Sequence, residues 1–176
     1  MEHVALHRTI ARRSSTFMDI LYRRANADDC ATLAMLCQTV QALHAQHHPR
    51  IFKASVDPLA VERHFREVVA APANRIHLAL VDGRAAGYAW ISLDDKAESP
   101  FTRARRQLFV HHLSVEPPYR RMGIATALVQ LIEHEARDHH ASLICLATWD
   151  FNDEAFALFR KAGFSLQVTN LWKRFD

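Results

Sequence analysis

One segment in the second half of the chain, residues 113–126, constrains the fold more than any other part of the sequence. It follows an apolar run and leads into apolar residues at helical spacing over residues 124–136, so it joins a strand to a helix. The first turn of a helix has unpaired N–H groups and a partial positive charge, which both favour phosphate binding. Gly123 lets the backbone approach a ligand closely, and Arg120 and Arg121 add positive charge. We therefore predict an anion site that suits a diphosphate.

The same turn has a plainer interpretation, a tight turn with one glycine and two solvated arginines. It is not a P-loop, because no Gly-Lys-Ser/Thr sequence ends it, and it lacks the glycine pattern of the dinucleotide-binding fingerprint. The pattern Gly123-x-Ala125 is weak evidence when taken alone.

Apolar patterns and turn signals along the whole chain predict an α/β fold. Asn26-x-x-Asp29 is typical of a capping box, Asp57-Pro58 of a helix start and Asp82-Gly83 of a two-residue hairpin turn. The helix before the fifth strand should make the fourth and fifth strands parallel, so we expect a mixed central sheet flanked by helices. The expected strands cover residues 20–24, 76–81, 85–93, 108–115, 143–148, 164–168 and 171–174, and the expected helices cover residues 26–44, 57–71, 124–136 and 152–162.

The length and composition of the chain fit one domain. Of its 176 residues 49% are hydrophobic, which suffices for a core. We expect residues 1–18 to be a flexible N-terminal extension, with Met18 as an alternative start, and residues 19–176 to form the domain. No apolar run approaches the roughly 20 residues of a membrane-spanning helix, so no membrane partner is expected. Three cysteines without a signal peptide predict a cytoplasmic protein without disulfides.

Two spaced motifs carry a family resemblance. The first, Arg120-x-x-Gly123-x-Ala125, follows Val115-Glu116-Pro117-Pro118-Tyr119; the second is Asn152-x-x-Ala155-x-x-Leu158-Phe159-x-Lys161-x-Gly163-Phe164. With the order of elements, they resemble the GCN5-related N-acetyltransferase (GNAT) family over residues 19–175. The resemblance implies the GNAT fold and an acetyl-CoA-dependent enzyme that moves an acetyl group directly to a primary amine, with coenzyme A as product. The identity of the amine acceptor is not readable from these motifs.

The resemblance also implies a site for acetyl-CoA. The backbone of Leu113 and Val115 would pair with the pantetheine arm, the amides of residues 121–126 would hold the pyrophosphate, and Asn152 and Lys161 would approach the cofactor from the last helix. The expected cofactor-binding residues are Leu113, Ser114, Val115, Arg120, Arg121, Met122, Gly123, Ile124, Ala125, Thr126, Asn152, Phe159 and Lys161. Asn152 is equally an N-cap, and Lys161 a favourable last-turn cation.

The candidate catalytic residues are His111, His112 and Val115. His111 occupies the place where the family often has a glutamate base, and an imidazole with a pKa near 6.5 suits proton transfer. On a regular strand His111 and His112 would point to opposite faces, so one would face the cleft. The N–H of Val115 would polarise the thioester carbonyl. Either histidine is also interpretable as a partly buried, hydrogen-bonded side chain.

One departure from the family pattern favours an alternative function. Phe159 stands where the family often has a tyrosine that protonates the leaving thiolate. Tyr88, Tyr119 or Ser114 could replace that acid, and a thiolate can also leave unassisted, because a thiol pKa near 8.5 is low. The alternative is a non-catalytic sensor that binds acyl-CoA. A third alternative, a module that binds nucleic acid or another partner through Arg8, Arg12, Arg13 and Arg103–Arg106, is ranked last, because interleaved aromatic residues and a binding motif are missing and the net charge is only +3.

Histidines near residue 44 raise the question of a metal. His44-x-x-His47-His48 has no cysteine or carboxylate at ligand spacing, so we expect no metal and a solvated helix end. By analogy with the family, these histidines and Phe52 would flank the acceptor pocket. A strand at residues 171–174 would leave an edge through which a homodimer could form.

Overall fold

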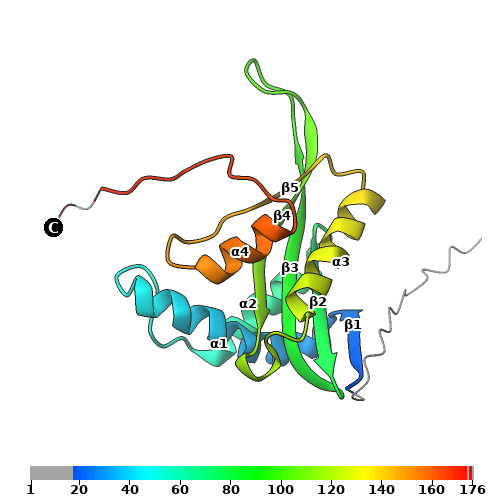
Figure 1. Ribbon diagram of the computed structural model, residues 1–176, viewed down its shortest axis with the longest axis vertical. Helices are drawn as coiled ribbons and strands as arrows, with labels where there is room; N and C mark the ends of the chain where they lie inside the picture. The colour runs from blue at the N-terminus through cyan, green and yellow to red at the C-terminus, as the bar shows by residue number, and fades with distance from the viewer. Residues whose placement is uncertain (1–17, 174, 176) are drawn as a thin grey trace, which may run out of the picture.

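The computed structural model describes residues 18–173 and residue 175, so the expected N-terminal extension lies outside the described residues except for Met18. One five-stranded sheet in the order β1-β2-β3-β4-β5 forms the centre of the molecule (Figure 1). The strands are antiparallel from β1 to β4, and β5 is parallel to β4, as predicted. Their bounds are β1 Ile20–Arg24, β2 Asn74–Val81, β3 Arg84–Lys96, β4 Arg105–Val115 and β5 Leu143–Leu146.

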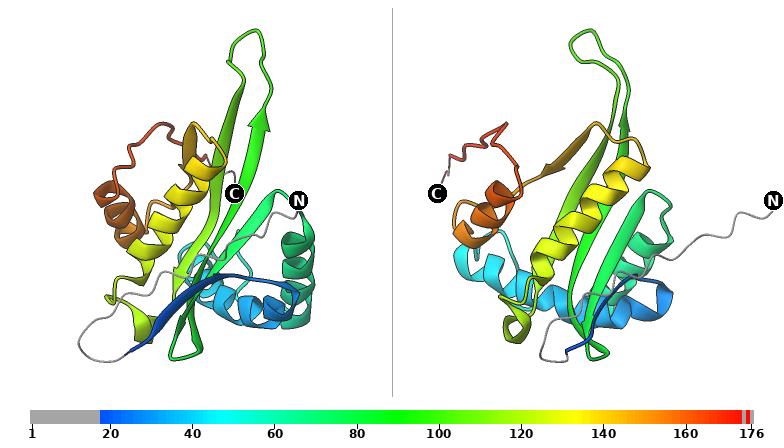
Figure 2. Two further views of the ribbon diagram at one scale, coloured as in Figure 1. Left: turned by 90° about the vertical axis from the view of Figure 1, so that its right-hand side faces the viewer. Right: turned by 45° about the vertical axis from the view of Figure 1, so that its right-hand side comes forward.

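Helices cover both faces of the sheet, so two apolar layers form. One face carries α1 and α2, and the other carries α3 and α4 (Figure 2). Phe65 and Leu78 are fully buried between the sheet and the α1–α2 pair. Leu108 and Leu128 are fully buried between the sheet and α3. The helices are α1 Cys30–His47, α2 Pro58–Ala70, α3 Ile124–Asp138 and α4 Asp153–Lys161, with short 3₁₀ turns at Ala27–Asp29 and Pro117–Tyr119. No helix in the described ranges is long and apolar enough to cross a bilayer.

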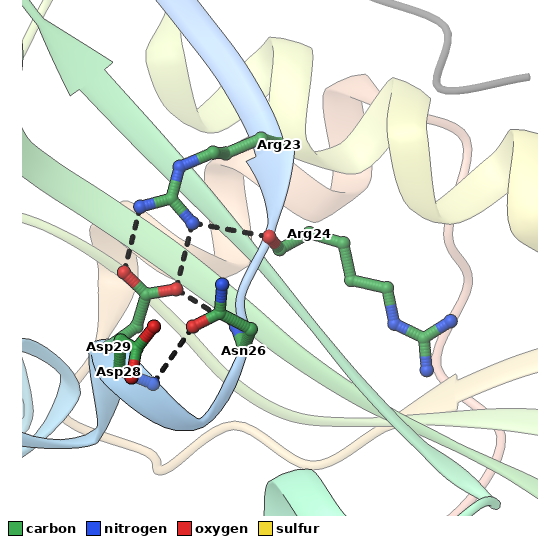
Figure 3. A network of polar contacts seen from close by, with 5 residues as sticks. All are labelled: Arg23, Arg24, Asn26, Asp28 and Asp29. Atoms are coloured by element: carbon green, nitrogen blue, oxygen red, sulfur yellow. Dashed lines mark hydrogen bonds and ion pairs between the residues drawn. The ribbon is translucent and has the colours of Figure 1, made fainter.

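The predicted capping box at the start of the first helical segment is present. Asn26 Oδ1 accepts a hydrogen bond from the Asp28 amide, and the Asp29 carboxylate accepts one from the Asn26 amide, both at 2.8 Å (Figure 3). Arg23 on β1 donates two hydrogen bonds of 2.7 Å to the same carboxylate. These bonds to Arg23 lower the pKa of Asp29. The network therefore links the first strand to the helix that follows it.

The other turn signals are also confirmed. Asp57 caps α2 by accepting a hydrogen bond from the Leu59 amide at 3.1 Å, with Pro58 in the first turn. Asp82 and Gly83 both have positive φ, 49° and 77°, as a type I′ hairpin turn requires.

Several element boundaries differ from the prediction. The charged loop expected between the third and fourth strands, residues 94–106, is shorter than predicted and covers residues 97–104, because β3 runs to Lys96 and β4 begins at Arg105. Arg106 and Asp95 face each other across the two strands and form hydrogen bonds of 2.7 and 2.9 Å, which stabilise a polar hairpin that projects beyond the sheet (Figure 1). The first helix continues to His47 rather than ending at His44.

The prediction of two closing strands at residues 164–168 and 171–174 is wrong for the described part of the chain. Residues 164–173 form no strand and lead away from the sheet (Figure 1). A β-prone sequence becomes a strand only when a neighbouring strand accepts its hydrogen bonds and covers its side chains. Here Leu171 and Val168 stay 92% and 75% exposed.

Candidate active site

An irregularity in β4 places both candidate histidines on one face of the sheet. On β3, Trp90 pairs with His112 and the next residue, Ile91, pairs with Val110. His111 therefore has no partner on β3 and is the extra residue of a β-bulge. The ring of His111 stacks on Trp90 at 4.4 Å, and that of His112 meets the same indole at 5.2 Å. The expectation that the two side chains face opposite sides is therefore wrong, because strict alternation holds only in a regular strand.

His112 lies in the less polar of the two environments. Its Nδ1 is 2.8 Å from the hydroxyl of Tyr88, which is fully buried. Burial, and then the nearby imidazoles of His111, His44 and His64, lower the pKa of His112 to about 4. The side chain is therefore neutral at neutral pH and has a hydroxyl, not a carboxylate, as its partner.

His111 lies closer to the surface. Its Nε2 is 2.9 Å from the Ser92 hydroxyl, and its ring is held between Trp90 and Phe109. Burial lowers the pKa of His111, with a smaller opposing effect of Asp94. His111 is therefore also predominantly neutral at neutral pH.

Strands β4 and β5 separate next to the bulge. Their ladder ends at the pair Val110 and Leu146, whereas β4 continues to Val115. Beyond that point no strand within the described part of the chain lies along the edge of β4. Arg120, in the turn that follows, donates a hydrogen bond of 3.2 Å from Nε to the carbonyl of Val115 on this edge.

The hydrogen-bond pattern shows which backbone groups face the open edge. The Glu116 amide donates to the Ala86 carbonyl at 2.8 Å, and hydrogen-bonded pairs alternate along an antiparallel ladder. Ser114 is therefore bonded to β3, and the N–H and C=O groups of Leu113 and Val115 point toward the β5 side. These are two of the residues that the sequence motif singled out.

A glycine that sequence reasoning missed makes the close pairing at this end of β4 possible. A Cβ atom at Gly87 would lie 2.5 Å from the Ser114 carbonyl oxygen, closer than real contacts allow. Any larger residue would push β3 away from β4. A glycine inside an otherwise apolar strand was the available signal.

The turn after β4 presents a row of backbone amides. Arg121 and Gly123 both have positive φ, 65° and 81°, and the first helical hydrogen bond of α3 runs from Ala127 to Gly123. Among the described residues, none accepts a hydrogen bond from the amides of residues 121–126. A Cβ atom built on Gly123 meets no atom within 4 Å, so the turn is not covered at this residue. This geometry suits an oxyanion ligand.

The remaining expected cofactor residues lie on α4. Asn152 Oδ1 accepts a hydrogen bond of 3.1 Å from the Ala155 amide and so acts as the N-cap. The Phe159 ring packs against Phe164 at 5.4 Å, and Lys161 is exposed in the last turn. The cap occupies the carbonyl oxygen of Asn152 and leaves its amide nitrogen available.

A cavity of about 370 Å³ lies between β4 and the α1–α2 pair, with His112 in its wall. The first two helices and the segment between them supply the other residues. They are Cys37, Lys53, Ser55, Val56, Asp57, Ala60, Val61, His64 and Phe65.

The histidines at the end of α1 are solvated only in part, because His47 is exposed as predicted whereas His44 and His48 are half-buried. His44 stacks on Phe52 at 4.8 Å, His47 on Phe151 at 4.1 Å, and the His48 ring lies 4.6 Å from that of Trp149. Trp149 and Phe151, which lie far along the sequence, contribute to this packing, and local spacing does not reveal it. Within the described ranges, no group of three potential ligands is placed to hold a metal ion.

Comparisons with known proteins agree with this architecture. The sequence model of the acetyltransferase (GNAT) family matches residues 31–164. No curated protein matches the sequence.

Similar solved structures cover most of the chain at low identity. A mutant of the BH1408 protein from Bacillus halodurans is 22% identical with a TM-score of 0.81, over 88% of this chain and 98% of that one. A predicted acetyltransferase from Clostridium acetobutylicum, solved with acetyl-CoA, is 21% identical with a TM-score of 0.68, over 89% and 96%. The aminoglycoside N-acetyltransferase AAC(6')-Iy, in complex with CoA, is 16% identical with a TM-score of 0.70, over 93% and 99%.

Proposed function

The chain belongs to the GNAT acetyltransferase family, and from this we propose that it is an enzyme that transfers the acetyl group of acetyl-CoA directly to a primary amine. One observation carries the proposal: unpaired amides at residues 121–126 adjoin the open edge of β4. The first group suits a diphosphate and the second suits an extended amide-containing arm, and acetyl-CoA contains both. Two of the similar structures contain acetyl-CoA or CoA.

In this proposal the chain holds acetyl-CoA mainly through its backbone. The N–H and C=O groups of Leu113 and Val115 would bond the pantetheine arm as an added strand does, and Arg120 would release the Val115 carbonyl. The amides of residues 121–126 would bind the pyrophosphate, with Arg121 adding charge. Asn152 has one free nitrogen for the arm, and Lys161 is exposed for a phosphate. Ser114, Met122, Ile124, Ala125 and Thr126 shape this turn and the strand before it.

The catalytic groups would be His112, His111 and Val115. Both histidines are neutral at neutral pH and can accept a proton from the attacking nitrogen, and His112 already lines the cavity. The Val115 N–H on the open edge would stabilise the developing oxyanion. Phe159 has no proton to donate, so the thiolate would leave unassisted or receive its proton from another group.

A calorimetric titration with acetyl-CoA, followed by measurement of thiol release with a panel of amines, tests the proposal. We expect binding with one site per chain and thiol release that depends on the amine. An absence of binding would refute the proposal.

The second candidate function is a sensor that binds acyl-CoA without turnover. Phe159 favours it, because this side chain has no proton to donate to the leaving thiolate and, among the described residues, its only ring contact is with Phe164. Binding without thiol release from any amine would support it. A Phe159→Tyr variant separates the two functions, since a gain in turnover is expected only of an enzyme.

A further inference from the structure

The cavity beside His112 offers little to a highly charged amine. Its walls are mostly apolar or ring side chains, and they approach the ring of His112 from α1 and α2. Cys37 is the wall residue from α1, Ala60, Val61, His64 and Phe65 come from α2, and Val56 comes from the segment just before α2. A flat apolar body therefore fits them better than a flexible polar chain.

The charges in this cavity are not those that bind ammonium groups. Asp57 is its one carboxylate, and that group caps α2 through the Leu59 amide at 3.1 Å and lies 3.9 Å from the Arg63 guanidinium. Lys53 is the one permanent cation in the lining, and no described carboxylate lies within ion-pair distance of its ammonium group. A polycation would meet Lys53 and a carboxylate already engaged with the Leu59 amide and close to Arg63, whereas a carboxylate ligand would find a cation without an ion-pair partner among the described residues.

The nearby bases are also weak. The hydrogen-bond partner of His112 is the Tyr88 hydroxyl, and that of His111 is the Ser92 hydroxyl. No described carboxylate bonds to either ring. Burial lowers the pKa of both. An alkylamine is uncharged in only about one molecule in a thousand at neutral pH and needs a stronger base, whereas an arylamine is already uncharged.

On the basis of the proposed acetyl transfer, we infer that the acceptor is an aromatic amine that carries a carboxylate, with its ring in the apolar cavity, its amine beside His112 and its carboxylate beside Lys53. The amine nitrogen bonds to the acetyl carbon, the carbon–sulfur bond breaks, and its electron pair leaves with the sulfur of CoA. In this step the surplus proton of the nitrogen passes to Nε2 of His112, in the tautomer whose Nδ1–H donates to the Tyr88 hydroxyl 2.8 Å away. Once the nitrogen is acylated its proton is acidic, so a weak base suffices.

Four probes separate the features of this inference. They are 4-aminobenzoate, aniline, which lacks the carboxylate, 4-(aminomethyl)benzoate, whose amine is charged, and the polycation spermidine. We expect the largest kcat/KM for 4-aminobenzoate, about fivefold above aniline, since an exposed charge pair contributes up to about 1 kcal/mol. Lys53→Met should abolish that preference. The control Lys96→Met should not, because Lys96 lies on the β3–β4 hairpin and pairs with Asp94 at 3.3 Å.

The possible outcomes separate this inference from the proposed function. A higher kcat/KM for spermidine or 4-(aminomethyl)benzoate at pH 7, or an unchanged preference in Lys53→Met, would overturn the inference and leave acetyl transfer intact. If acetyl-CoA binds but no thiol is released with any of the four probes, saturation-transfer NMR tests whether 4-aminobenzoate occupies the proposed acceptor site. Contact of the enzyme with the ring protons of 4-aminobenzoate, weakened in Lys53→Met, supports the acceptor site, and absence of contact overturns it. A failure to bind acetyl-CoA refutes the proposed function itself.

Discussion

The hydroxyl of Tyr88 on β3 lies 2.8 Å from Nδ1 of His112 on β4, so a fully buried phenol fixes the ring that lines the cavity. Because Nδ1 is engaged, Nε2 is the nitrogen left for a ligand. The pairing also ties the candidate base to the core rather than to a mobile surface group.

We predict that His112 makes folding stability pH-dependent. Burial lowers its pKa to about 4 from the ordinary 6.5, so its contribution is fully present above pH 6.5 and is lost as pH falls toward 4. The loss should reach about 3 kcal/mol. Urea unfolding between pH 7 and pH 4 should show a shallower decline for His112→Phe than for the wild type. His134→Gln, on the exposed side of α3, should follow the wild-type curve.

We predict that substitution of Gly123 lowers acetyl-CoA affinity by more than its backbone strain alone explains. Gly123 and Gly83 both have positive φ and open space at the Cβ position, so a tryptophan at either site should cost about 1 kcal/mol of stability. Only Gly123→Trp fills the space before the amides of α3, and calorimetry should show an affinity loss of at least about tenfold. Equal affinities of the two variants would remove the turn from the binding site.

The Arg23–Asp29 pair should stabilise the start of the first helical segment. Arg23→Met should lower the free energy of unfolding at pH 7 by about 1 kcal/mol, a modest value because the arginine is partly exposed. Because the pKa of Asp29 is lowered, this contribution is present above pH 4 and disappears as pH falls through the folded-state pKa. The matched variant Arg24→Met, which loses one hydrogen bond of 3.3 Å to Asn74, should change stability less. A larger effect for Arg24→Met would contradict the assignment.

The pH–rate profile should reveal the charge state of the acceptor. With an aromatic amine, kcat/KM should stay flat from pH 8 to below pH 6, because the lowered pKa of His112 keeps it neutral over this range. With an alkylamine the rate should rise with pH as the uncharged fraction grows. A rate that falls as pH drops below about 6.5 with the aromatic amine would point to a base with an ordinary pKa instead.

Local signals in the sequence predicted much of the fold. Asn26, Asp57 and Asp82-Gly83 each act within a few residues, so caps and turns could be placed without knowledge of the tertiary structure. The parallel pairing of β4 with β5 followed from the helix between them. The turn at residues 121–126 was likewise identifiable, because glycine and helix periodicity are local features.

The features that were missed depend on distant partners. The bulge at His111 exists only relative to Trp90 on β3, and the cover over His44 comes from Phe52 and from residues after β5. The segment 164–168 has strand-like composition, but composition does not tell whether an edge is within reach. Side-chain placement in the candidate site therefore required the structure.

The bulge also predicts where β4 tolerates a change of length. Phe109, His111 and His112 face the α1–α2 side, whereas Val110 and Leu113 face α3. Deleting His111 would restore simple alternation without turning any other side chain over. A deletion of Ala89 from the regular part of β3 would invert one half of that strand. Thermal unfolding should therefore show a mild loss for the first deletion and a severe loss for the second, so the histidine acts as an insertion that the sheet can lose while keeping its register.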